Sequence, residues 1–85
     1  MNISERAYSS AIATTVEFIE SKLVVHLVDG RELHVPLSWF PRLQSATSDE
    51  REHWRLIGQG CGIHWEYADE DISVLGLLRG EGAPS

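Results

Sequence analysis

The sequence predicts an α+β domain in which a three-stranded antiparallel meander and a short fourth strand pack with two or three short helices. Three observations predict this class. Residues 14–37 form alternating, β-branched runs separated by short turn sequences. Helix-start signals follow, first a proline turn and then a capping-box spacing. The chain of 85 residues, with 42% hydrophobic residues, is large enough for one hydrophobic core and too small for two.

The meander is the clearest pattern in the chain. Strands are expected at residues 14–20, 22–28 and 31–37, where apolar and polar side chains alternate. The dipeptide Glu20-Ser21 separates the first two runs as a two-residue loop, and Asp29-Gly30 lies between the last two. Asp-Gly is a strong hairpin signal. The three runs therefore predict consecutive antiparallel strands.

The length of the second loop decides which side chains share a face. A two-residue turn at Asp29-Gly30 would mix polar and apolar side chains on each face. A three-residue loop that begins at Val28, with the glycine in the left-handed conformation, pairs Val25 with Leu33. We therefore predict the three-residue loop. The resulting apolar face consists of Val16, Phe18, Leu23, Val25, Leu27, Leu33 and Val35.

After the meander the pattern becomes helical. Pro41 is expected at the first position of a short helix, because its ring already fixes the backbone angle that a helix start requires. Thr47 and Glu50 have the spacing of a capping box. They predict a second helix that runs to about Ile57. Its thin apolar stripe consists of Leu43, Ala46, Trp54 and Ile57.

The last third of the chain is predicted to contain one strand and one helix. The glycine-rich residues 58–62 are expected to form a loop, and residues 63–65 the short fourth strand. Acidic residues 69–71 are expected at the N-terminus of a final helix over residues 72–79, since the helix dipole favours anions there. Gly80 is expected to end this helix.

Residues 14–80 are thus predicted to be a single α+β domain, with a flexible N-terminal arm at residues 1–13 and a disordered tail at residues 81–85. Cys61 is the sole cysteine, so no intramolecular disulfide can form. The chain has no apolar run of the ~18–20 residues that a transmembrane helix needs. It also has no signal-peptide pattern at its start. A cytoplasmic location without membrane contact is therefore predicted.

The formal net charge of −6 is unevenly distributed. Residues 1–43 hold five acids and four bases, whereas residues 44–85 hold eight acids and three bases. An acidic surface repels phosphate backbones, so no nucleic-acid partner is expected. A small basic protein is the partner with complementary charge.

An ordered series of motifs runs through the chain from about Val16 to Gly80. It consists of Asp29-Gly30-Arg31, Val35-Pro36-Leu37 with Trp39, Pro41-Arg42-Leu43, Ala46-Thr47, Arg51, Trp54-Arg55-Leu56-Ile57-Gly58, Gly62-Ile63-His64-Trp65 and Asp69-Glu70-Asp71-Ile72. With this series the chain resembles a bacterial family known as domain of unknown function 2442.

The resemblance implies a small α+β fold, found alone or joined to a helix-turn-helix domain. Some members of the family look like the antitoxin half of a small toxin–antitoxin gene pair. This chain departs from the family pattern at Glu66, where the family often has proline. At 85 residues it is also expected to lack a second, DNA-binding domain and hence an autoregulatory role on DNA.

Two groups of side chains have the residue types of a metal site. The first, His26, Glu32 and His34, lies on the second face of the meander, and a cross-strand polar pair of His26 with Glu32 is the favoured alternative. The second, His64 with acidic residues 69–71, lacks the spaced ligands and turn glycine of an EF-hand-type loop. No metal and no cofactor is therefore predicted. The second face consists of Glu17, Ile19, Val24, His26, Val28, Glu32 and His34.

Cys61 lies between two glycines, three residues before His64. A nucleophilic thiol needs a base that a third group holds in place, and an oxyanion donor. Glycines do not fix a side chain, and the family resemblance implies no catalytic cysteine at this position. We therefore predict that the protein is not an enzyme. A metal-dependent enzyme that uses His64 and the acids is the least favoured alternative.

Trp39 and Phe40 lie on a turn between two prolines. Two adjacent large aromatic side chains do not easily both point inward, so one is expected to be an exposed anchor. Arg42 is close by, and Trp and Arg are enriched at interface hot spots. Trp54 and Trp65 are expected in the core.

The predicted function is that of a non-catalytic protein-interaction module, the antitoxin-like half of a bacterial toxin–antitoxin pair whose small protein partner is encoded nearby. The alternative is a structural or regulatory accessory domain that self-associates as a homodimer through a sheet edge. The predicted partner-binding residues are Trp39, Phe40, Arg42, Glu66, Asp69, Glu70 and Asp71.

Overall fold

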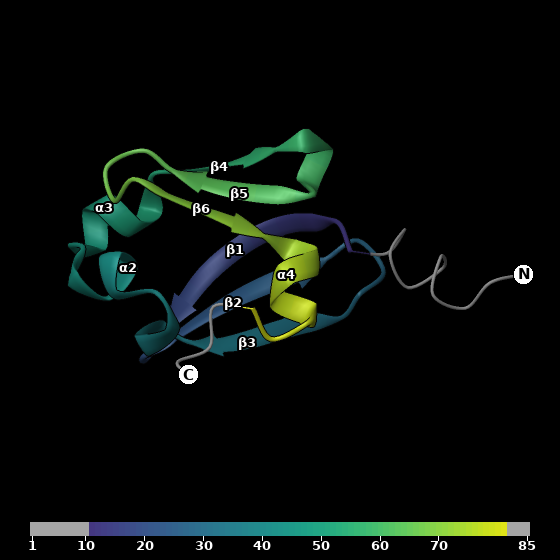
Figure 1. The fold of residues 1–85 in the computed structure, drawn as a ribbon, viewed down its shortest axis with the longest axis horizontal. Helices are drawn as coiled ribbons and strands as arrows, with labels where there is room; N and C mark the ends of the chain where they lie inside the picture. The colour runs from purple at the N-terminus through teal and green to yellow at the C-terminus, as the bar shows by residue number, and fades with distance from the viewer. Residues whose placement is uncertain (1–10, 82–85) are drawn as a thin grey trace, which may run out of the picture.

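The structure is a computed structural model that describes residues 11–81. Three strands come first along the chain, then short helices, then three more strands and a last helix (Figure 1). The strands form two antiparallel three-stranded sheets, β1-β2-β3 and β4-β5-β6. The α+β class is therefore confirmed. The detail of one meander with a single extra strand was wrong, because the second half of the chain builds a sheet of its own.

The first sheet consists of β1 (Ala13–Ile19), β2 (Lys22–Leu27) and β3 (Glu32–Pro36). Val25 lies opposite Leu33, as predicted. The Leu27 N–H donates to the Arg31 carbonyl at 2.8 Å, which closes a three-residue loop. Gly30 within this loop has φ 95°, in the left-handed region that favours glycine. The predicted register and loop are both confirmed.

The second sheet consists of β4 (Trp54–Ile57), β5 (Gly62–Trp65) and β6 (Glu70–Ser73). A 3-10 turn, η2 (Gly58–Gly60), leads from β4 towards β5. Strand β5 contains the residues of the predicted fourth strand. It is the middle strand of this second sheet and does not extend the meander.

The helix predicted to run to Ile57 is much shorter. It begins as predicted, since α3 (Ser48–Glu52) has a capping box in which Thr47 Oγ1 accepts the Glu50 N–H at 3.1 Å. After His53 the chain enters β4, so the helical prediction was wrong for residues 54–57. Alternation explains the strand: Trp54 and Leu56 pack against the core while Arg55 is exposed.

The final helix, α4 (Val74–Leu78), begins later than predicted. Its N-cap is Ser73, whose Oγ accepts the Gly76 N–H at 3.1 Å. The prediction that acidic residues 69–71 cap this helix was therefore wrong. Two of those acids belong to β6, where the side chains alternate around buried Ile72. Gly80, with φ 79°, follows the helix as expected.

Two more short helical segments precede α3 in the connection between the sheets. They are η1 (Leu37–Trp39) and α2 (Pro41–Ser45). Pro41 occupies the start of α2, as predicted. Figure 1 shows α2 and α3 together at one end of the molecule, beside the turn between β5 and β6.

The hydrophobic core contains side chains from both sheets and from the helices. Trp65 of β5 is fully buried and packs edge-on against Phe18 of β1, with 6.2 Å between ring centroids. Its Nε1 donates to the Arg51 carbonyl at 3.0 Å. Trp65 is thus a core residue, as predicted, and Trp54 is half-buried against the same core. The buried members are Ala11, Ala13, Val16, Leu23, Val25, Leu27, Val35, Leu37, Phe40, Leu43, Ile63, Trp65, Ile72, Val74 and Leu77.

Two sequence-based expectations meet the ends of the described range. Residues 1–10 of the predicted arm and residues 82–85 of the predicted tail lie outside it, whereas Ala11 and Ala13 are buried. Within residues 11–81, no helix has the length and apolar character needed to cross a membrane.

Candidate functional site

The second sheet has one face on the core and one face outward. The cross-strand row that faces the core consists of Leu56, Ile63 and Ile72, and the neighbouring row that faces outward consists of Arg55, His64 and Asp71. The outward side of β4, β5 and β6 is called the outer face below. It carries a cation, an imidazole and a carboxylate side by side.

His64 and Asp71 form a hydrogen-bonded pair on the outer face. The His64 Nδ1 lies 2.5 Å from the Asp71 Oδ1. The His64 side chain is 21% exposed and the Asp71 side chain 70% exposed, so the ring lies against the sheet and the carboxylate faces solvent. Among residues 11–81, no serine, threonine or cysteine is hydrogen-bonded to this imidazole. The pair therefore has the orienting carboxylate of a catalytic base without a nucleophile.

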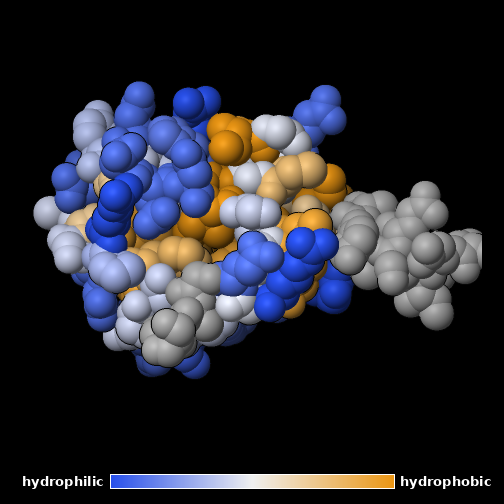
Figure 2. Space-filling model, in the orientation of Figure 1, coloured by the Kyte–Doolittle hydropathy of each residue, from blue (hydrophilic) through white to orange (hydrophobic). Residues whose placement is uncertain are grey.

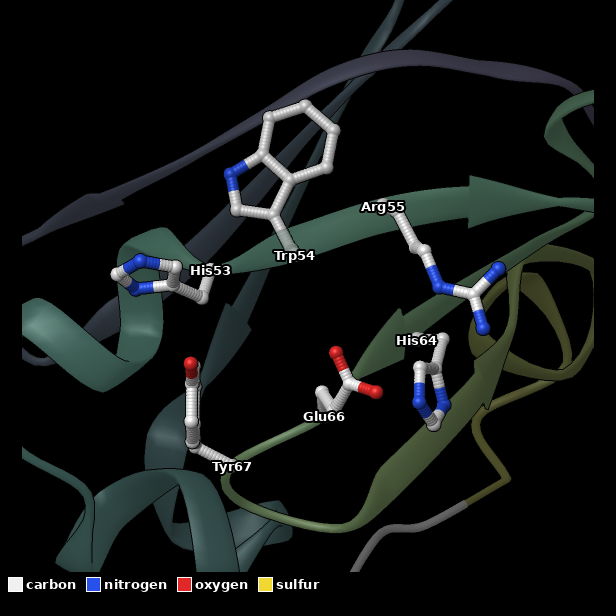
Figure 3. Close-up of a pocket in the computed structure, with 6 residues that line it drawn as sticks. All are labelled: His53, Trp54, Arg55, His64, Glu66 and Tyr67. Carbon is white, nitrogen blue, oxygen red and sulfur yellow. The ribbon is translucent and has the colours of Figure 1, made fainter.

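An open pocket of about 190 Å³ lies at the end of the outer face nearest α3. It is lined by His53, Trp54, Arg55, His64, Glu66 and Tyr67. Figure 3 shows the His53 and Tyr67 rings together at one end and Arg55 with His64 at the other, with Glu66 between them. The His53 and Tyr67 rings meet edge-on, with centroids 5.1 Å apart. The His53 Nδ1 donates to the Asp49 carbonyl at 2.7 Å, which holds this ring in place.

Arg55 and Glu66 are the two charged side chains of the pocket that have no partner. Within the described part of the chain, neither makes a hydrogen bond or an ion pair. Both are exposed, and Tyr67 beside them is 63% exposed. The pocket thus presents an unpaired cation, an unpaired anion and an accessible aromatic ring.

The predicted turn at Trp39, Phe40 and Arg42 is less open than expected. Phe40 is 8% exposed and belongs to the core, and Trp39 is half-buried against it, so neither ring is the exposed anchor that the turn suggested. Arg42 is exposed and its Nη1 donates to the Asp69 carbonyl at 2.6 Å. The structure therefore joins the predicted turn to the acidic segment through Arg42.

The acidic side chains gather at one end of the molecule. Figure 2 shows hydrophilic surface over α3 and the turn between β5 and β6. The acidic end consists of residues of α3, of the adjacent turn between β5 and β6, and of the start of β6: Asp49, Glu52, Glu66, Asp69 and Glu70. Only Asp69 has a partner there, Arg42, while no interaction of the other four carboxylates is found within residues 11–81. Asp71, the remaining predicted acid, is instead paired with His64.

The histidines of the first sheet form a polar network. His26 lies opposite Glu32, as predicted, and its Nδ1 is 3.7 Å from the Glu32 Oε2. The His26 Nε2 contacts the Glu17 carboxylate, and the His34 Nε2 is 3.0 Å from the Glu32 Oε1. The hydrogen bond from His34 lowers the pKa of Glu32, against a smaller opposing effect of desolvation.

Cys61 lies in a different hollow from His64. This second hollow has a volume of about 400 Å³ and is lined mainly by Ile57, Cys61, Gly62 and Ile72. The thiol is exposed and is not bonded to His64. Across residues 11–81, no group of three or more His, Cys, Asp or Glu side chains has the geometry to hold a metal ion.

Sequence reasoning missed three residues of the pocket: His53, Arg55 and Tyr67. His53 and Arg55 were assigned to a helix, so their side chains were not placed beside His64. The alternation of residues 54–57, with an exposed residue between apolar ones, is the sequence signal for a strand here, although four residues fit the end of a helix equally well. Tyr67 lies in the turn between β5 and β6, where spacing predicts no orientation.

Comparisons with known proteins find a family and a fold. The family model described as "Protein of unknown function (DUF2442)" matches residues 13–83. None of the curated proteins compared with the chain gives a significant match.

Two solved structures have a similar fold. A protein of unknown function from Rhodospirillum rubrum is 28% identical, with a TM-score of 0.74 over 87% of this chain and 92% of that one. An uncharacterized protein from Chromobacterium violaceum, solved by NMR in solution, is 25% identical, with a TM-score of 0.75 over 98% of this chain and 76% of that one. They support the fold and give no activity for the pocket.

Proposed function

The chain belongs to the DUF2442 family, and we propose that its own role is that of a non-catalytic, cytoplasmic protein-interaction module. The observation that supports this role is the acidic end, where the carboxylates of Asp49, Glu52, Glu66 and Glu70 make no hydrogen bond or ion pair within the described residues. Like charges gathered on one surface repel one another, which opposes the compact state. A partner of opposite charge relieves this repulsion and associates faster.

The partner that fits the acidic end is a small basic protein. Arg42 holds the turn between β5 and β6 in place through the Asp69 carbonyl, so the carboxylates of this end are presented from an ordered backbone. An ordered surface loses little conformational entropy on binding. We propose that the partner is encoded beside this chain and that the chain acts as the antitoxin-like half of the pair.

Co-expression with the product of the neighbouring gene tests this function. A complex that co-purifies, together with restored growth in cells that express the partner, is the expected result. Reversing two carboxylates, Glu52→Lys with Glu70→Lys, is expected to slow association and weaken the complex, with a smaller effect at high salt. Glu20→Lys, at an exposed acid in the turn between β1 and β2, is the control and is expected to leave binding unchanged. A partner that neither co-purifies nor has its toxicity relieved would contradict the proposal.

A further inference from the structure

The outer face of the second sheet carries a cation that the proposed function does not use, Arg55, beside Glu66 of the acidic end. Arg55 projects from β4 and Glu66 follows β5, and both line the same open pocket. Because Arg55 lies opposite His64 in the β4–β5 register, Glu66 is its diagonal neighbour on the same side. Neither charge has a partner in the part of the chain that the structure describes. The pocket therefore suits a ligand that carries one charge of each sign at the same spacing.

The end of the pocket beside Glu66 has the chemistry of an arginine site. His53 and Tyr67 meet edge-on, with 5.1 Å between ring centroids, and form an aromatic corner. Figure 3 shows the Glu66 carboxylate between this corner and His64. A guanidinium stacks on an aromatic face and pairs with a carboxylate at the same time. An arginine side chain is thus the group that satisfies both features.

We propose that a second copy of this chain occupies the pocket. A two-fold axis that exchanges the positions of Arg55 and Glu66 brings the partner's Arg55 to Glu66 and the partner's Glu66 to Arg55. The interface of such a dimer is self-complementary, as two-fold symmetry requires. The spacing of the two charges matches on both sides, because the same two residues supply it. Another protein would need a positive and a negative side chain that have the same spacing by chance.

The dimer is expected to be weak. Three strands about 4.8 Å apart and four residues long give a face roughly 14 Å on a side. That is well below the ~800 Å² that each partner buries in a standard stable interface. The contact therefore forms at high concentration and weakens with salt, since exposed charges are screened. The acids Asp49, Glu52, Asp69 and Glu70 stay outside the Arg55–Glu66 pairing, so the proposed basic partner still has its surface.

Sedimentation equilibrium of purified variants tests the dimer. The wild-type chain is expected to approach twice its monomer mass as its concentration rises. The single variants Arg55→Glu and Glu66→Arg are each expected to associate at least about tenfold more weakly, because each homodimer would face like charges. An equimolar mixture of the two variants is expected to regain wild-type association, since every cross-pair then joins opposite charges. The doubly reversed chain R55E/E66R restores the charge pairing but brings a glutamate to the His53–Tyr67 corner, so it is expected to regain only part of the association.

The equimolar mixture distinguishes loss of the interface from loss of folding, because two misfolded variants would not regain association when they are mixed. Lys22→Glu, a charge reversal on the first sheet, is the matched control and is expected to leave association unchanged. Circular dichroism checks that every variant is folded. A wild-type chain that stays monomeric, or a mixture that stays as weak as its components, would overturn the dimer. Either result leaves co-purification with a basic partner intact, so the two proposals fail separately.

Discussion

The outward sides of the two sheets differ in how completely their charged side chains are paired. On the outward side of the first sheet, His26 lies between the carboxylates of Glu17 and Glu32, and His34 also contacts Glu32, so the central charges of that side are paired within the sheet. On the outer face of the second sheet, His64 is paired with Asp71, whereas Arg55 beside them has no such partner in the described residues. A surface whose charges are already paired gains little from a ligand. In the proposals made above, the first sheet is the scaffold and the second sheet is the side that would meet partners.

The two sheets also differ in how much of their stability comes from contacts within the sheet and how much from packing against the other sheet. The first has strands of seven, six and five residues joined by tight loops. The second has strands of four residues each. Trp65 of its central strand packs against Phe18 of the first sheet, and the Trp65 Nε1 donates to the Arg51 carbonyl. Short strands contribute few ladder bonds. The second sheet is thus expected to depend on packing against the first.

Of the substitutions considered, removal of the Trp65 side chain is expected to weaken the packing of the second sheet against the first most severely. Trp65→Ala leaves a large cavity between the sheets and an unpaired Arg51 carbonyl, and is expected to cost about 3–5 kcal/mol of unfolding free energy. Urea unfolding measures it. Trp54→Ala, a substitution of a half-buried tryptophan in the same sheet, is the control and is expected to cost clearly less. Equal losses at the two positions would show that the second sheet does not depend on Trp65 in particular.

Gly30 lies in the loop between β2 and β3, and Gly60 lies in η2 between β4 and β5. Their φ angles are similar, so the same substitution at both positions compares the loops of the two sheets. At Gly30 (φ +95°) an added Cβ would enter open space, whereas at Gly60 (φ +97°) it would lie 2.7 Å from the Ile12 Cγ2 and 2.8 Å from the Ala13 carbonyl oxygen. Gly30→Ala is expected to cost about 1–2 kcal/mol from the left-handed backbone alone. Gly60→Ala adds a clash with β1 and is expected to cost at least about 1 kcal/mol more. Thermal unfolding of the two variants measures both losses of stability. Equal losses would contradict the close approach of Gly60 to Ile12 and Ala13.

The capping box of α3 fixes the entry to the second sheet. Thr47 Oγ1 accepts the Glu50 N–H, and the Glu50 carboxylate accepts the Thr47 N–H at 2.9 Å. Thr47→Ala is expected to cost about 1 kcal/mol. Thr47→Ser keeps the hydroxyl and is expected to recover most of that loss. If the two variants unfold alike in urea, the hydroxyl does not stabilise α3.

The same contrast explains what the sequence predicts and what it does not. The register of the first sheet follows from local rules, since a loop that ends in Gly30 permits one pairing that keeps apolar side chains together. In the second sheet, residues 54–57 offer only four positions, too few to separate a strand from the end of a helix. The acids at 69–71 suit a helix start equally well by charge. Only the packing of Ile72 and Trp65 into the common core decides between these states, and packing is not a local signal.

Acid should weaken the first sheet through its paired carboxylates. The Arg31 backbone N–H lowers the pKa of Asp29 below its ordinary value of 3.8, and the hydrogen bond from His34 lowers the pKa of Glu32 below 4.5. A carboxyl whose pKa is lower in the folded chain stabilises the fold above its unfolded pKa, and this contribution is lost as the pH falls through the folded pKa. Urea unfolding at pH values from about 6 to about 3 should therefore show falling stability, with a shallower fall in Asp29→Asn and in Glu32→Gln than in the wild type. Identical pH profiles for the wild type and both variants would mean that these pairs are not formed, and the first sheet would lose its distinction as the self-paired side of the molecule.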